Sequence, residues 1–206
     1  MLDNIIIFSL LVIAVVIHEV AHGYAACLLG DPTAKNAGRL SLNPLKHVDP
    51  MGTIIFPGII IMLKLLGIAS LPPIGWAKPV PVNFARLKNP KRDMIFVALA
   101  GPLSNIAQAA LFTFLFHKTQ DETFVLIFWY GIFINLLLAI FNMVPIPPLD
   151  GSRLVMGILP NRWMFRYMKL EPYGILIVMI LLSMGLFDHV VFPLIQIVGS
   201  WLGVKF

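Results

Sequence analysis

Long apolar runs separated by short polar loops dominate the chain. A membrane-spanning helix needs about 20 consecutive apolar residues, within a range near 17–25. The runs cover residues 5–29, 52–71, 94–116, 124–144, 175–187 and 190–204. The first, third and fourth reach spanning length, whereas the last two are marginal unless each borrows flanking residues. The pattern predicts one all-α polytopic membrane domain over residues 1–206, with about five transmembrane helices.

The run at 52–71 differs from the others because it contains Pro57, Gly58 and Lys64. Proline and glycine interrupt helices, and a lysine at membrane depth is costly. A plain span, a re-entrant hairpin and an interfacial element therefore all remain open for this segment.

The distribution of basic residues helps to separate these alternatives. Three basic residues lie in loop 31–50, and five lie in loop 72–92 without any acid. Positive loops belong on the cytoplasmic side, and both loops lie there only if segment 52–71 enters and leaves on one side. The loop after Asp150 carries four more basic residues between positions 153 and 169, and it lies inside in the same arrangement. If the last two runs then go out and back, Lys205 also lies inside, and 13 of the 15 basic residues are cytoplasmic. We therefore favour a re-entrant or interfacial segment over a simple crossing.

Composition agrees with a membrane protein. Hydrophobic residues make up 59% of the chain and charged residues 12%, against about 25% charged residues in soluble domains. This composition argues against a soluble globular domain and against disorder, and we read the net charge of +5 as a topology signal, with no nucleic acid as partner. Cys27 is the single cysteine, so neither an internal disulfide nor a multi-cysteine metal cluster can form. Asp3 and the length of the first apolar run argue against a cleavable signal peptide.

The first run contains His18-Glu19-Val20-Ala21-His22. Histidines at positions i and i+4 share one helical face, where both imidazoles can bind one zinc ion. Glu19 can reach a zinc-bound water and act as its general base, as in the H-E-x-x-H motif of metalloproteases. A structural hydrogen-bond cluster and a metal site without catalysis are the alternatives. Ionisable side chains inside a spanning helix usually have a function, and a non-catalytic metal site has no need of Glu19.

A catalytic zinc ion requires a third protein ligand. The candidates elsewhere in the chain are His47, Asp49, His117, Asp150, Glu171 and His189. Asp150 stands out because three prolines in four positions precede it, and they force irregular backbone at membrane depth. Such backbone is tolerated only where protein or a water-filled cavity surrounds it. The Asp150-Gly151 pair also fits an ordinary turn, so the residues alone leave both interpretations open. We expect His117 and His189 to be solvated and Glu171 to form a surface ion pair.

These motifs together resemble the site-2 protease family of intramembrane zinc metalloproteases. His18-Glu19-x-x-His22 is paired with Asn142-x-x-Pro145-x-x-Pro148-Leu149-Asp150-Gly151 far downstream. Between them, Ala100-Gly101-Pro102-Leu103-Ser104-Asn105 resembles the family's Ala-Gly-Pro-x-x-Asn helix start. The resemblance covers residues 10–152.

The resemblance implies that His18, His22 and Asp150 bind one zinc ion per chain and that Glu19 is the general base and acid. It implies that Asn142 lies near the scissile peptide and helps to stabilise its oxyanion. The substrate would be a membrane-embedded segment of another protein, cleaved within the bilayer of the inner or plasma membrane, nearer the cytoplasmic face. A catalytic core over about 4–152 would precede C-terminal helices over about 172–204. We expect no PDZ or nucleotide-sensing domain in this chain.

Several polar positions remain open. His47 and Asp49 either orient a zinc ligand or belong to a plain loop. Residues 75–83 form either an extended edge that pairs with unwound substrate or a rigid connector. We expect Asn105 and Asn135 to make structural hydrogen bonds across the helices.

The alternative function is a zinc-binding membrane protein without proteolysis, such as a metal transporter or a chaperone-like binder. Transport is disfavoured because most ionisable residues outside the motifs lie at the ends of the apolar runs.

Overall fold

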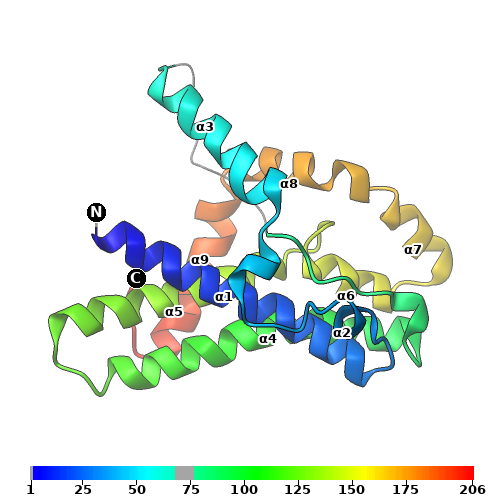
Figure 1. Cartoon of the computed structure of the whole chain (residues 1–206), viewed down its shortest axis with the longest axis horizontal. Coiled ribbons are helices and arrows are strands. Elements are labelled where there is room, and N and C mark those ends of the chain that lie inside the picture. Colours follow the sequence, from blue (N-terminus) through cyan, green and yellow to red (C-terminus); the bar gives the residue numbers. More distant parts are fainter. Residues whose placement is uncertain (1, 68–76) are drawn as a thin grey trace.

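The computed structural model describes residues 2–67 and 77–206, and helices dominate this part of the chain (Figure 1). The three long helices are α1 (Leu2–Leu28), α4 (Pro90–Phe116) and α5 (Glu122–Asn142). The shorter helices are α2 (Thr33–Asn36), η1 (Pro44–His47), η2 (Pro50–Ile55), α3 (Phe56–Leu65), η3 (Phe84–Arg86), α6 (Asp150–Ile158), α7 (Asn161–Met168), η4 (Glu171–Tyr173), α8 (Gly174–Ser183), η5 (Phe187–Val191) and α9 (Phe192–Trp201). No β-strand occurs among the described residues, so the all-α class is confirmed for them.

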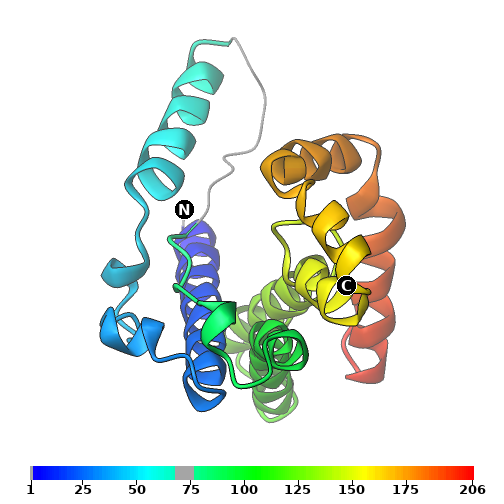
Figure 2. The same ribbon diagram turned by 90° about the vertical axis from the view of Figure 1, so that its right-hand side faces the viewer.

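The long helices α1, α4 and α5 pack against one another and form the centre of the molecule (Figures 1 and 2). Small residues allow the close approach. Ala14 and Ala109 are completely buried, and a side chain on Gly131 would meet the ring of Phe112 at 2.8 Å. Close packing through small residues is how helices associate in a membrane, where apolar surface gains little from leaving lipid.

The three long helices are also the ones long and apolar enough to cross a membrane. The segment from α7 to α8 and the helix α9 give at most one further span, because they are bent by 73° at a short break. With ten residues each, α8 and α9 are about 15 Å long, roughly half the thickness of a bilayer core. The described residues therefore support three or four spans instead of the expected number of about five.

The C-terminus does not lie where the charge pattern predicted. The indole N–H of Trp129, in the first half of α5, donates to the carbonyl oxygen of Lys205 at 3.1 Å. The His117 ring, next to the end of α4, is hydrogen-bonded to the carbonyl oxygen of Leu202 at 3.0 Å. Lys205 therefore lies near the loop between α4 and α5, at the opposite end from the basic loop after Asp150. The prediction was wrong because α8 and α9 do not make two separate crossings.

The segment after residue 47 forms η2 and α3, and α3 projects away from the bundle in both views (Figures 1 and 2). Pro57 lies in the first turn of α3, where its missing N–H costs nothing. The N–H of Lys78 donates to the carbonyl oxygen of His47 at 2.8 Å, so the chain leaves and returns at one place. This contact favours the re-entrant or interfacial alternative over a simple crossing. Residues 68–71 of the expected segment lie outside the described residues.

Helix α4 begins earlier than the sequence predicted. It starts at Pro90, where the Asp93 carboxylate accepts from the N–H of Asn89 at 2.8 Å and caps the first turn. The motif from Ala100 to Asn105 therefore lies inside α4 and does not start it, and Pro102 is accommodated within the helix.

A buried aspartate, Asp31, connects the segment after α1 to the segment before η3 through hydrogen bonds. Asp31 accepts hydrogen bonds from the N–H and hydroxyl of Thr33, and from the N–H of Asn83 at 2.6 Å. Burial by itself would raise the pKa of Asp31, but these hydrogen bonds outweigh it and hold the pKa below its ordinary value of 3.8. The carboxylate thereby ties segment 77–83 to the bundle.

We expect Asp31→Asn to lower the free energy of unfolding by about 1–3 kcal/mol at neutral pH, because the amide cannot accept all of these donors. A lowered folded-state pKa means that ionised Asp31 stabilises the fold above about pH 4 and that this contribution disappears as the pH falls through the folded-state pKa. Melting temperatures in detergent across this range should therefore converge for the two proteins in acid. Asp188→Asn at an exposed position is the control. Equal melting at neutral pH would contradict this role of Asp31.

Candidate active site

The two motif histidines lie one turn apart on α1 and face the same point inside the bundle. His18 and His22 are buried, with 6% and 8% of their surface exposed, and their Nε2 atoms are 3.0 Å apart. The helical spacing of four residues produces this geometry directly.

Asp150, the first residue of α6, completes the group. Its Oδ2 atom lies 3.1 Å from Nε2 of His18, and its Oδ1 atom lies 3.2 Å from Nε2 of His22. The candidate ligand atoms of the three residues all lie within 4.8 Å of one another. The structure therefore brings together the three residues that the resemblance implied, although Asp150 is more than 120 positions from the histidines in the sequence.

The outer nitrogens of both imidazoles are held by oxygen acceptors. Nδ1 of His18 lies 2.5 Å from Oδ1 of Asn105, and Nδ1 of His22 lies 2.7 Å from the carbonyl oxygen of Val97. A carbonyl oxygen can only accept, so each Nδ1 carries the hydrogen and each Nε2 presents a lone pair to the interior. Asn105 is itself fixed, because its amide donates to Oδ1 of Asn135 at 2.9 Å.

Gly101 on α4 leaves the space in which the three residues meet. A Cβ atom at this position would lie 2.3 Å from Nε2 of His22 and 2.6 Å from Nε2 of His18. Any side chain there would displace the imidazoles or push α4 away from α1. The glycine is therefore required by the close approach of α4 to the histidines.

This arrangement fits a metal ion. In the neutral imidazoles neither Nε2 atom has a hydrogen to donate, and Oδ2 of Asp150 is buried without a hydrogen-bond donor. Two lone pairs and a carboxylate that face one another at about 3 Å need a cation between them. Two imidazole nitrogens and one carboxylate oxygen form a ligand set that is typical of catalytic zinc.

Glu19 is held beside this group by a backbone donor. Its Oε2 atom accepts from the N–H of Val80 at 2.8 Å. Within 78–81 the N–H of Lys78 is bound to His47, and Pro79 and Pro81 have no N–H. These residues have few free N–H donors for an extended substrate. The contacts therefore favour a rigid connector over an edge that pairs with substrate. Residues 75 and 76 of this predicted element lie outside the described residues.

The other predicted positions in the described part of the chain are hydrogen-bonded to groups other than the three ligands. Asn142, the last residue of α5, donates its amide to the carbonyl oxygen of Leu138 at 2.9 Å, and its catalytic role stays a prediction. His47 is buried and bonded to the carbonyl oxygen of Ser41, and Asp49 accepts from the N–H of Gly52.

The rejected ligand candidates also have other partners. His117 and His189 are exposed and bonded to backbone oxygens. Glu171 forms the expected ion pair, with Arg153 at 2.6 Å.

The expected hydrogen bonds of Asn105 across the helices are confirmed. Sequence reasoning missed three contributions to the site, namely His18 as a partner of Asn105, the Val97 carbonyl oxygen and the space at Gly101. Two of them left a signal in the sequence. Gly101 and Asn105 are four residues apart and therefore share one face of α4. The carbonyl oxygen of Val97 left none, because any residue supplies that group.

Comparisons with known proteins agree with the site. The model of "Peptidase family M50" matches residues 117–185, which include the stretch from Asn142 to Gly151. "Putative zinc metalloprotease YwhC" of Bacillus subtilis is 35% identical over 200 residues, which are 90% of this chain and 84% of that protein. "Putative zinc metalloprotease Rip2" of Mycolicibacterium smegmatis is 29% identical over 193 residues, 92% of this chain and 71% of that protein. No solved structure matches.

The identity to the Bacillus protein extends over most of both chains. The likeness therefore concerns the whole membrane domain and not one short pattern. The chain belongs to peptidase family M50, the site-2 protease family, and is a peptide hydrolase of the zinc metalloprotease type with membrane-spanning helices.

Proposed function

We propose that the chain is an intramembrane zinc endopeptidase that cleaves a transmembrane or membrane-proximal segment of another protein. The observation that carries this proposal is the convergence of His18, His22 and Asp150 inside a bundle of spanning helices. A site buried among such helices is reached most directly by a substrate that is itself in the membrane.

One zinc ion per chain would be held by Nε2 of His18, Nε2 of His22 and the carboxylate of Asp150. Zinc bound there supplies Lewis acidity, which polarises a peptide carbonyl and lowers the pKa of a bound water to about 7. Asn105 and the Val97 carbonyl oxygen keep the imidazoles in the tautomer and orientation that this requires.

Glu19 acts as the general base and then as the general acid. It takes a proton from the attacking water and delivers it to the amine of the leaving peptide. The N–H of Val80 holds one oxygen of the carboxylate at 2.8 Å, which restricts where the base can lie. The proline-flanked connector therefore contributes to catalysis by positioning Glu19.

Asn142 lies at the end of α5, directly before the irregular loop that leads to Asp150. A rotation of its side chain away from Leu138 would free the amide to donate to the oxyanion of a substrate carbonyl.

The site lies closer to one end of the bundle. His22 is six residues from the end of α1 at Leu28, which corresponds to about 9 Å. The basic loops that follow α1 and precede α4 lie at that end. Positive loops favour the cytoplasm, so we place the site within the inner or plasma membrane, nearer the cytoplasmic face.

The direct test is cleavage of a panel of transmembrane substrates by the purified, zinc-loaded chain and by Glu19→Gln. We expect Glu19→Gln to retain zinc and to lose about 100- to 10,000-fold in turnover, because the amide keeps the volume but cannot accept the proton. Cleavage products are measured by mass spectrometry. Unchanged turnover in Glu19→Gln would exclude Glu19 as the base, and absence of cleavage by both proteins would contradict the proposed function.

Asp150→Ala should weaken zinc binding, measured by competition with a chromophoric chelator, because it removes one of three ligands. The loss should exceed the about 10- to 100-fold change that follows removal of an outer hydrogen bond to a ligand. Asp188→Ala, an exposed aspartate, is the matched control. Equal affinity in the two variants would remove Asp150 from the ligand set.

Asn105→Ala should lower zinc affinity by about 10- to 100-fold, since His18 loses the acceptor that orients its ring. Gln108→Ala, three residues further along α4, should leave the affinity unchanged. If both variants bind zinc as tightly as the parent chain, Asn105 has a purely structural role.

A further inference from the structure

Helix α7 carries a basic face that points away from the protein. Arg162, Arg166 and Lys169 are spaced at i, i+4 and i+7, which places them on one side of the helix, and all three are exposed. Met164 and Tyr167 lie on the opposite side and are half-buried. The helix therefore packs through one face and presents cations on the other.

Large aromatic side chains flank the basic face. Trp163 and Phe165 keep 56% and 61% of their surface exposed. The guanidinium of Arg166 lies 5.1 Å from the centre of the Trp163 ring. Exposed tryptophan beside arginine is typical of the layer between lipid chains and water, where the ring is partly in the apolar region and the cation contacts headgroups.

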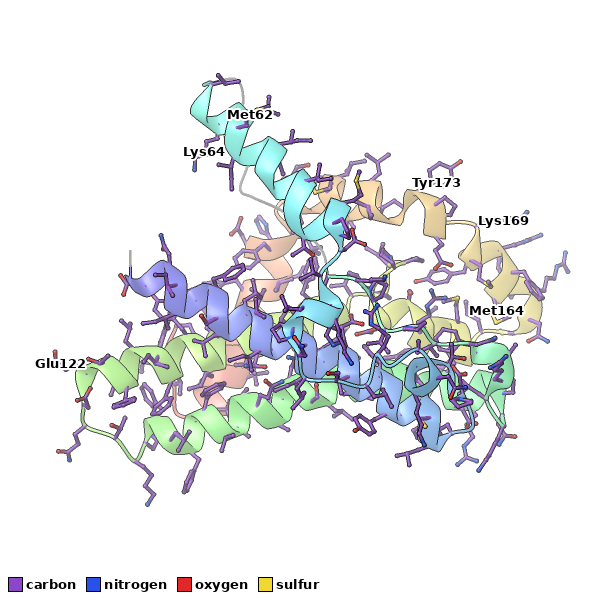
Figure 3. The ribbon with its side chains drawn as sticks, in the orientation of Figure 1. Met62, Lys64, Glu122, Met164, Lys169 and Tyr173 are labelled. Carbon is purple, nitrogen blue, oxygen red and sulfur yellow. The ribbon has the colours of Figure 1, made fainter. Side chains whose placement is uncertain are left out.

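Helix α7 also lies at the level where headgroups are expected. Gly157, near the end of α6, approaches the carbonyl oxygen of Lys91 at the start of α4, so the chain has reached the end of the bundle when α7 begins. Figures 1 and 3 show α7 at the periphery of the molecule, and Figure 3 shows Lys169 at the outer edge of the molecule.

The surrounding charge at this end is positive. Lys88, Lys91 and Arg92 precede or begin α4 and are exposed. The nearby acids do not neutralise them, because Asp93 is buried in its cap and Glu171 is paired with Arg153. This surface therefore attracts anionic partners.

We propose that α7 binds the headgroups of anionic phospholipids through Arg162, Arg166 and Lys169, with Trp163 and Phe165 inserted beside them. A lipid surface is the partner that this chemistry fits best, because the protein spans a bilayer and the helix lies at its boundary. Each basic residue near an anionic membrane surface strengthens the attraction by about fivefold.

The proposed lipid contact is mechanically linked to the candidate active site. The Tyr167 hydroxyl donates to the carbonyl oxygen of Pro145 at 2.6 Å. The Arg153–Glu171 ion pair joins α6, which begins with Asp150, to the segment just after α7. Lipids that hold α7 therefore also restrain the backbone that presents Asp150.

The test uses the full chain in nanodiscs and lipids with brominated chains, which quench tryptophan fluorescence on contact. The quenching due to Trp163 is the difference between the parent chain and Trp163→Phe, a substitution of an exposed residue that should not disturb folding. Brominated phosphatidylglycerol and brominated phosphatidylcholine are compared at equal mole fraction. We expect anionic lipid to be preferred at Trp163 by about fivefold or more, and the preference to fall as salt is added.

In the triple variant Arg162→Gln, Arg166→Gln, Lys169→Gln, the ratio of quenching by anionic lipid to quenching by phosphatidylcholine should fall to about one. The matched control Lys35→Gln, Lys64→Gln, Lys118→Gln removes the same charge at exposed positions elsewhere and should keep the preference. Equal quenching by the two lipids in the parent chain, or an equal loss in both triple variants, would overturn the proposal. Because the measurement involves neither zinc nor cleavage, its outcome is independent of the proposed catalytic function.

Discussion

Two buried imidazoles and a partly buried carboxylate among membrane-spanning helices depend on fixed partners, because bulk water is scarce at this depth. The Asn105 amide oxygen and the Val97 carbonyl oxygen bind the outer imidazole nitrogens. Both partners come from α4, so the packing of α4 against α1 also sets the tautomer of each histidine. The inner Nε2 atoms and the Asp150 carboxylate remain without a hydrogen-bond donor. A zinc ion bound between them would accept their lone pairs.

Asp150 can lie beside the two histidines because α5 ends within the bundle. The chain from Met143 to Leu149 is irregular, and the polar groups of such backbone at membrane depth need partners within the protein. The Tyr167 hydroxyl binds the carbonyl oxygen of Pro145, and Gly174 packs so closely on the carbonyl oxygen of Pro147 that a Cβ atom would lie 1.9 Å from it. The segment after α6, which carries no recognised motif, therefore helps to position Asp150.

The motif residues and the three long helices could be predicted because both signals are local. Apolar run length predicts the spans, and the spacing of His18 and His22 predicts their shared helical face. The path of the C-terminal helices could not be predicted in this way, because two short apolar runs give no sign of the bend between them. The partners of the histidines were missed for a similar reason. Asn105 and Val97 contact α1 through tertiary packing, and a carbonyl oxygen leaves no trace in residue type.

The central claim is that a single zinc ion is bound by His18, His22 and Asp150. X-ray absorption spectroscopy of the zinc-loaded chain in detergent tests it most directly, because it reports the number and kind of ligands. We expect nitrogen and oxygen ligands at about 2.0–2.2 Å, with multiple scattering from two imidazole rings. A sulfur ligand at about 2.3 Å, or scattering from one or three imidazoles, would contradict it.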